Sequence, residues 1–187
     1  MRDTKTKILD VAEELIQRVG FNAMSYKHIS DSIGISKASI HHHFHKKENL
    51  LNDLLDRCHV SYGRNYQRII EGDETAPEKL RELAGVFENG LQKQQLCIIG
   101  TISSDLNTLQ DSSCDILKTT IKRTVDIFSE AFEQGRKEGS LTFTGTDQEV
   151  AYGFFSFLLG AQISTRAYGG EKAFRSATEA IISGWIN

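Results

Sequence analysis

The stretch SYKHISDSIGISKASIHHHFHKK, residues 25–47, decides the fold of this chain. Two pairs of its apolar residues lie four positions apart, Ile29 with Ile33 and Ile40 with Phe44. Residues four apart lie on the same face of a helix, because an α-helix completes a turn in about 3.6 residues. The stretch therefore predicts two short helices, each with one apolar face.

The residues between these two helices suit a tight turn. Gly34 most readily takes the left-handed conformation that ends a helix. Ser36 follows, and its hydroxyl can accept a hydrogen bond from the free N–H groups that open the second helix. Two short helices joined by a glycine turn form a helix-turn-helix, whose second helix enters the major groove of DNA.

The side chains expected to point outward from the second helix suit contact with a polyanion. They are small groups and hydrogen-bond donors without a carboxylate: Lys37, Ala38, Ser39, His41, His42 and His43. Lys27 and Tyr26, at the start of the preceding helix, are weaker candidates for contact with the DNA backbone. The alternative is a helical hairpin with no role in nucleic-acid binding.

The run from Ile8 to Leu51 resembles the DNA-binding half of the TetR family of transcriptional repressors. The matching pieces are ILDVAEELIQRVGFNAMS, HISDSIGISKASIHHHF and KKENLL. Family members usually carry a Gly-Thr-Leu-Tyr-x-Tyr/His-Phe-like run in the recognition helix. This chain departs from that run at five positions, with Ala38, Ser39, Ile40, His41 and His43. The resemblance is specific over about the first fifty residues and only architectural beyond them.

The resemblance also implies a phosphate contact by Lys47, because TetR-like proteins place a lysine at the matching point. Lys46 and Lys47 open a helix, where free backbone N–H groups already favour an anion. The alternative is a pair of lysines that only meet solvent.

The distribution of charge favours a nucleic-acid partner for the N-terminal part. The whole chain of 187 residues has a net charge of −3. Residues 1–50 carry eight Lys and Arg against six Asp and Glu, and they also hold five of the six histidines. A basic segment on an acidic body is sufficient for DNA, because electrostatic steering depends on where the charge lies.

The three cysteines and the N-terminus indicate a cytoplasmic protein. Cys58, Cys97 and Cys114 are widely spaced and form no CxxC pair, which argues against a disulfide framework. The N-terminal MRDTKTKILD lacks the apolar core of a signal peptide, and no apolar run is long enough to cross a bilayer. We therefore expect no contact with a membrane.

The rest of the chain predicts an all-α fold. Pro77 is the single proline, and β-branched runs with strand-like alternation are missing. We expect a three-helix DNA-binding domain in residues 1–47 and a helical ligand-binding and dimerisation domain in residues 48–187. A long helix from Lys47 would begin at the first domain and end in the second, so that a tilt of this helix would move the recognition helix.

The last two expected helices predict a homodimer. The segment Val150–Tyr168 is apolar nearly all round, so that one face would be covered by the core and the other by a second subunit. TetR-like proteins dimerise in this way. The residues expected at the interface are Gly153, Phe157, Gly160, Ala161, Phe174, Ile181 and Trp185.

Aromatic and hydroxyl residues of the second domain either line an effector cavity or fill the core. The candidate ligand-binding residues are Tyr62, Tyr66, Phe87, Cys97, Thr101, Ser104, Phe128 and Phe155. Cys97 also raises an alternative function, a helical ligand- or metal-binding protein that senses electrophiles through this thiol, with the hairpin only structural. Otherwise Cys97 is a small core residue.

No motif in the sequence indicates an enzyme or a bound cofactor. There is no nucleophile elbow, no Walker loop and no GxGxxG after a strand. His41 and His45 lie four apart, but no Glu or Cys accompanies them at metal-ligand spacing, so we expect no metal there. The sequence therefore predicts a repressor that binds palindromic double-stranded operator DNA as a homodimer. A small hydrophobic or aromatic effector would release it.

Overall fold

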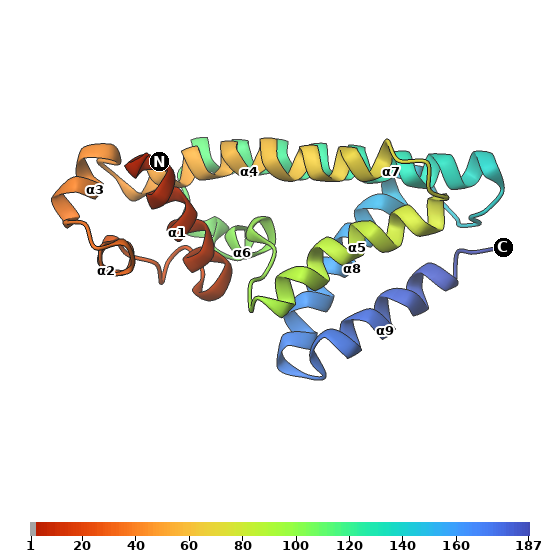
Figure 1. Ribbon diagram of the computed structural model, residues 1–187. Coiled ribbons are helices and arrows are strands. Elements are labelled where there is room, and N and C mark those ends of the chain that lie inside the picture. The colour runs from red at the N-terminus through yellow and green to blue at the C-terminus, as the bar shows by residue number, and fades with distance from the viewer. Residues whose placement is uncertain (1–2) are drawn as a thin grey trace. The chain divides into compact units, whose positions relative to one another are not determined.

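The computed structural model describes residues 3–187, and helices dominate this part of the chain (Figure 1). The elements follow one another as α1 (Thr4–Val19), α2 (Tyr26–Ile33), α3 (Lys37–His43), α4 (Lys47–Ile70), α5 (Ala76–Gln92), α6 (Ile98–Ser104), the 3-10 helix η1 (Leu106–Thr108), α7 (Asp111–Glu138), α8 (Asp147–Ala167) and α9 (Gly170–Ser183). The predicted all-α class, with an N-terminal helix-turn-helix and a C-terminal helical part, is confirmed.

The helices form two compact units. Unit 1 holds the chain up to Val60 together with Ile98–Thr120, and unit 2 holds Ser61–Cys97 and Ile121–Asn187. The units do not divide at residue 47, because α4 and α7 are long helices that contribute residues to both. The functional division at residue 47 therefore stays a proposal, and the first two residues of its DNA-binding part lie outside the described residues.

Unit 1 contains the helix-turn-helix, and its turn has the predicted chemistry. Gly34 ends α2 in the left-handed conformation, with φ of 68°. The Ser36 hydroxyl caps α3 by accepting from the Ser39 N–H, and the Ser25 hydroxyl caps α2 by accepting from the His28 N–H. Since each cap satisfies a backbone donor that the helix itself leaves free, both short helices have fixed starting points.

The core of unit 1 is built from the predicted apolar positions. Ile29, Ile40 and Phe44 are almost completely buried, and Ile8 and Ile16 of α1 are equally inaccessible. Helix α1 packs against α2, and α2 packs against α3. The three helices therefore bury one small apolar core and leave the outer face of α3 exposed.

Unit 2 is held together by aromatic side chains. Phe128 of α7 contacts Phe154 and Phe155 of α8, with ring centroids 6.3 and 5.9 Å apart. Phe132, one turn further along α7, contacts Phe154 and Trp185. Helix α5 packs against both α8 and α9, and α8 also packs against α9 (Figure 1). None of the helices in residues 3–187 is both long enough and apolar enough to span a membrane.

Candidate nucleic-acid interface and associated sites

The exposed face of α3 carries the predicted DNA-binding side chains. Lys37, Ala38, His41, His42 and His43 are exposed, whereas Ser39 is half-buried. No acidic residue lies within Lys37–His43. A row of donors and small groups on a short capped helix has the chemistry that base edges and phosphates need.

Tyr26 fixes the end of α3 against the start of α2. Its hydroxyl donates a hydrogen bond to the Phe44 carbonyl at 2.8 Å, and its ring lies edge-on to His41 with centroids 4.8 Å apart. Burial, with a smaller contribution from the Glu48 charge, raises the pKa of Tyr26 to about 12. The phenol therefore stays a donor and positions His41, a role that the sequence did not reveal.

Replacing Tyr26 with phenylalanine is expected to lower the free energy of unfolding by about 1 kcal/mol, because the Phe44 carbonyl loses its phenolic donor. Operator affinity should fall slightly as well, since the end of α3 loses its hydrogen bond to Tyr26, although the ring that contacts His41 remains. Chemical denaturation and operator titration of the same preparation measure both effects. Unchanged stability together with unchanged affinity would contradict this role of Tyr26.

Lys47 occupies a different place from the one expected for a phosphate ligand. Its ammonium donates to the carbonyl of Phe21 and, at 3.4 Å, to that of Asn22. It also lies 4.3 Å from the centre of the Phe21 ring. Burial lowers the pKa of Lys47, although the charges of Asp105 and Glu48 oppose that change. Because this ammonium is engaged by the turn between α1 and α2, we infer that Lys47 positions that turn, and its phosphate contact stays a prediction.

Asp105 and Thr108 also hold the same turn. The Asp105 carboxylate accepts from the Asn22 backbone N–H at 3.1 Å and from its side-chain amide at 2.9 Å. The Thr108 hydroxyl donates to the Asn22 amide oxygen at 3.1 Å. Residues that follow α6 therefore fix the entry into the helix-turn-helix.

The two roles of Lys47 make different predictions for salt dependence. If Lys47 only positions the turn, Lys47→Ala is expected to weaken operator binding while leaving the slope of log affinity against log salt unchanged, because no phosphate contact is lost. Lys37→Ala, on the exposed face of α3, is the matched control and should reduce that slope by about 0.9. Anisotropy titrations at several salt concentrations measure both slopes. A reduced slope in Lys47→Ala would support the phosphate contact instead.

The other basic candidates are placed as follows. Lys27 is exposed and forms an ion pair with Asp31 at 2.7 Å. Breaking an exposed ion pair costs little free energy, so Lys27 can exchange Asp31 for a phosphate. His45 donates through Nδ1 to the His41 carbonyl at 2.8 Å, which draws it back towards α3. Within residues 3–187, no group of three or more His, Cys, Asp or Glu side chains is arranged to hold a metal ion.

The aromatic ligand-binding candidates lie together in unit 2. Ring contacts run from Tyr62 to Tyr66, Phe128, Phe155 and Phe87, with successive centroids 6.3, 5.1, 5.9 and 6.2 Å apart. All but Tyr62 are buried. We call these five side chains the aromatic series of unit 2.

The other three ligand-binding candidates, Cys97, Thr101 and Ser104, are not part of the aromatic series. Cys97 is half-buried, and its backbone N–H donates to the Gln162 side-chain oxygen at 2.7 Å. Thr101 and Ser104 lie on α6, in unit 1. Ser104 is exposed, and its hydroxyl donates to the Thr101 carbonyl of its own helix at 2.7 Å.

The dimer candidates separate into surface and core residues. Gly153, Gly160 and Ile181 are exposed, and Phe157 and Trp185 are half-buried. Phe174 is 1% exposed and Ala161 is 7% exposed, so that both pack inside one chain. We therefore remove these two residues from the expected interface. Helical periodicity identified the apolar residues but not which of two apolar stripes faces inward.

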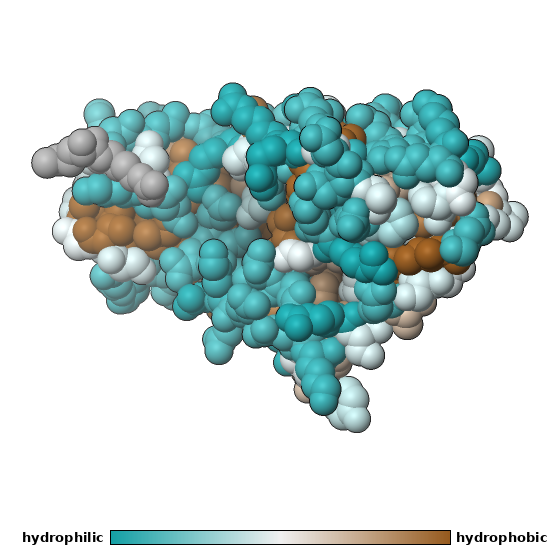
Figure 2. Space-filling model, turned by 45° about the vertical axis from the view of Figure 1, so that its right-hand side comes forward, coloured by the Kyte–Doolittle hydropathy of each residue, from teal (hydrophilic) through white to brown (hydrophobic). Residues whose placement is uncertain are grey.

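Residues that the sequence analysis did not select complete the exposed apolar face. Tyr152, Ile163 and Tyr168 are 58%, 59% and 85% exposed, although they are large. They lie on α8 or directly after it. The face of the molecule drawn in Figure 2 is mostly hydrophilic with separate hydrophobic areas. Large exposed side chains such as these three, where they gather, commonly mark interaction sites.

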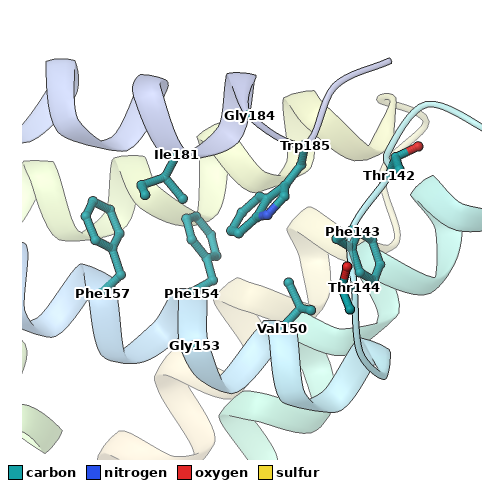
Figure 3. Close-up of a pocket in the computed structure, with 10 residues that line it drawn as sticks. All are labelled: Thr142, Phe143, Thr144, Val150, Gly153, Phe154, Phe157, Ile181, Gly184 and Trp185. Carbon is teal, nitrogen blue, oxygen red and sulfur yellow. The ribbon is translucent and has the colours of Figure 1, made fainter.

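A groove of about 430 Å³ continues this face between α8, α9 and the segment before α8 (Figure 3). Phe154 and Phe157 rise from α8 towards Ile181 and Trp185, and Phe143 closes one end. Gly153 adds no side chain, and a Cβ there would meet nothing within 4 Å. A neighbouring helix therefore has room to approach.

Comparison with known proteins agrees with these features. The model for bacterial regulatory proteins of the tetR family matches residues 8–54. The transcriptional repressor NemR of Escherichia coli K12 is 26% identical over 173 residues, covering 88% of this chain and 84% of NemR. The repressor KstR2 of Mycolicibacterium smegmatis is 25% identical over 154 residues, covering 80% of this chain and 73% of KstR2.

Solved structures match the chain over nearly its whole length. A TetR-family regulator from Agrobacterium tumefaciens has a TM-score of 0.92 and 27% identity, covering 98% of this chain and 97% of its own. A TetR regulator from Legionella pneumophila has a TM-score of 0.88 and 26% identity, covering 100% and 99%. Residues 8–54 therefore match the DNA-binding part of the tetR family of bacterial regulatory proteins, and the whole chain is similar in sequence and fold to TetR-family regulators.

Proposed function

We propose that the protein is a ligand-responsive transcriptional repressor that binds a palindromic operator as a homodimer. The exposed face of α3 carries this proposal, because it presents Lys37, His41, His42 and His43 with no acidic residue among them. Relatives that align with most of the chain are named transcriptional repressors, which supports the same function.

DNA binding would proceed through α3 in the major groove. The exposed histidines and Lys37 would contact base edges and phosphates, and Ala38 would allow close approach to the groove floor. Tyr26 and Lys47 would hold α3 and the turn before α2 in place without touching DNA. Affinity would depend strongly on salt, because contacts with phosphates release counterions.

Dimerisation would use the exposed apolar face of α8 and α9, including Tyr152, Gly160, Ile163 and Ile181. A twofold axis would bring the same face of a second copy against it, and a palindromic operator would mirror that symmetry. Exposed glycines at positions 153 and 160 support close packing of helices.

The effector would bind in the C-terminal helical part, near the aromatic series of unit 2. A small hydrophobic or aromatic molecule matches the rings of Tyr62, Tyr66 and Phe87. It would favour a dimer whose recognition helices no longer fit successive major grooves, a shift between two populations. The alternative function, in which the protein senses electrophiles through the Cys97 thiol, is not favoured over this proposal.

Titration of the purified protein with DNA that flanks its own gene tests the proposal. We expect saturable binding to one palindromic segment and at least tenfold weaker binding to a scrambled duplex of equal length. Native mass spectrometry of the same preparation should show a dimer. Equal affinity for both duplexes would refute the repressor function, whereas a monomer on DNA would refute only the dimeric part.

A further inference from the structure

Five of the six histidines of the chain lie on or next to the helices of the helix-turn-helix, and all five are exposed. They are His28 of α2, His41, His42 and His43 of α3, and His45 directly after α3. The sixth, His59, is half-buried on α4 and contacts the Thr120 hydroxyl at 3.2 Å. Imidazoles that are open to solvent are therefore concentrated in the part of the chain that is proposed to contact DNA.

Histidine is the side chain whose charge ordinarily changes between pH 5 and 8, because the pKa of a free imidazole is about 6.5. A neutral imidazole has one N–H donor, whereas the protonated ring has two donors and a positive charge. A phosphate within hydrogen-bond distance favours the protonated form, since opposite charges attract. DNA binding and proton uptake by such a ring therefore promote each other.

His41 and His42 are well placed for this coupling. No acidic residue lies within Lys37–His43, so neither ring has a carboxylate on its own helix. The His41 ring packs edge-on to Tyr26, which limits its movement, and the His42 ring lies 5.5 Å from the His43 ring. Positive charges on two adjacent rings would repel each other, and nearby phosphates would offset that repulsion.

Asp3, which precedes α1, is a carboxylate that acts on α3. It caps α1 by accepting a hydrogen bond from the Thr6 N–H at 2.7 Å. Hydrogen bonds with Thr6 lower the pKa of Asp3, and the His43 charge lowers it further. Because Asp3 attracts a charged His43 already in the free protein, His43 would gain less from a phosphate than His41 and His42.

The other charged groups around α3 leave this coupling in place. Asp31 of α2 pairs with Lys27 and lies within range of the His28 charge, and Glu48 of α4 acts on Tyr26. Tyr26 has a pKa of about 12, and an ordinary lysine is also protonated throughout the range from pH 6 to pH 8. The lysines on α3 and on the neighbouring elements are Lys5, Lys27, Lys37, Lys46 and Lys47. They therefore supply the part of the attraction to DNA that does not depend on pH.

We propose that operator binding takes up protons at His41 and His42, so that the affinity for DNA rises as the pH falls from 8 to 6. This inference rests on the proposed DNA-binding function of α3 and adds regulation by acid to it. The protonated rings donate to phosphate oxygens. The gain in affinity is complete below the pKa of the free imidazoles and is lost above their pKa in the complex, because only the protonated form gains from the phosphate.

The expected size of the effect follows from this linkage. If a phosphate binds the protonated imidazole about tenfold more tightly than the neutral one, one contact raises the affinity about sixfold between pH 8 and pH 6. A twofold dimer makes each contact twice, which gives about fortyfold for one histidine in each chain. Each contact should also take up about half a proton at pH 7.

The test is an anisotropy titration of the full-length protein with the palindromic duplex that flanks its own gene, at pH 6 and pH 8 and at one salt concentration. The wild-type affinity should be at least about fortyfold higher at pH 6. The double variant His41→Gln/His42→Gln can still form side-chain hydrogen bonds but cannot take up a proton, so its ratio of affinities should be at least about tenfold smaller. His59→Gln is the matched control, because His59 lies outside the helix-turn-helix, and it should keep the wild-type ratio.

Calorimetry of the same binding reaction at pH 7, in two buffers with different enthalpies of ionisation, counts the protons directly. The wild type should take up at least about one proton per dimer, and the double variant should take up fewer. Equal wild-type affinity at pH 6 and pH 8, or an equal pH dependence in the double variant, would overturn the proton linkage. Preference for the palindrome over a scrambled duplex in such a result would leave the repressor function intact, whereas no binding to either duplex would refute both.

Discussion

Replacing Ile163 with aspartate is expected to convert the protein from a dimer to a monomer and to abolish operator binding at ordinary protein concentrations. In the single chain Ile163 is 59% exposed, so the carboxylate stays hydrated and the monomer keeps its fold. In the proposed dimer the carboxylate would be buried without a cation, which costs about 3 kcal/mol in each chain. Since 1.4 kcal/mol is a factor of ten, the dimer should dissociate more than a hundredfold more readily.

Sedimentation equilibrium measures the association constant, and operator titration measures the consequence for DNA. Leu106→Asp is the matched control, because Leu106 is also exposed and apolar but lies on η1, outside the α8–α9 face. It should remain dimeric. If Ile163→Asp dimerises as tightly as this control, the two copies meet through another surface.

Features set by neighbours in the sequence could be predicted well. The start of α3 depends on the Ser36 hydroxyl and the Ser39 N–H three residues later, and the end of α2 depends on the backbone freedom of Gly34. These interactions act within one helical turn, so residue types at fixed spacings are sufficient to predict them. The exposed face of α3 follows from the same periodicity.

Contacts between distant segments could not be predicted. The resemblance to TetR-like proteins implied a phosphate contact for Lys47, but it did not reveal that Lys47 also contacts the Phe21 and Asn22 carbonyls, over twenty residues away. Asp105 meets Asn22 across 83 positions. Likewise, α8 has two apolar stripes, and only the packing of α5 and α9 against it determines which stripe is buried. Apolar periodicity gives the angle between the stripes but not the identity of their partners.

Three ion pairs, formed by two basic side chains, connect α1 to α4 in unit 1, and the two basic side chains differ in burial. Arg57 donates to Asp10 at 2.6 Å and to Glu13, and these side chains are only 22–37% exposed. Lys5 pairs with Asp53 at 2.6 Å, with side chains 50% and 40% exposed. Burial alone would lower the pKa of Arg57, but Glu13 and Asp10 outweigh burial and raise it. The Arg57 contacts therefore stabilise the charged form and join the two helices firmly.

Arg57→Met is expected to lower the free energy of unfolding by about 2 kcal/mol, because it removes two charge-assisted hydrogen bonds in a partly buried place. Operator affinity should fall at least tenfold, since α1 supports α2 and α3 and loses its fixed angle to α4. Lys5→Met, which cuts the exposed pair between the same helices, should cost less than 1 kcal/mol. Urea unfolding followed by circular dichroism and operator titration measure both variants. Equal effects of the two substitutions would show that the orientation of the DNA-binding helices does not depend on Arg57, and that apolar packing between α1 and α4 is sufficient to hold it.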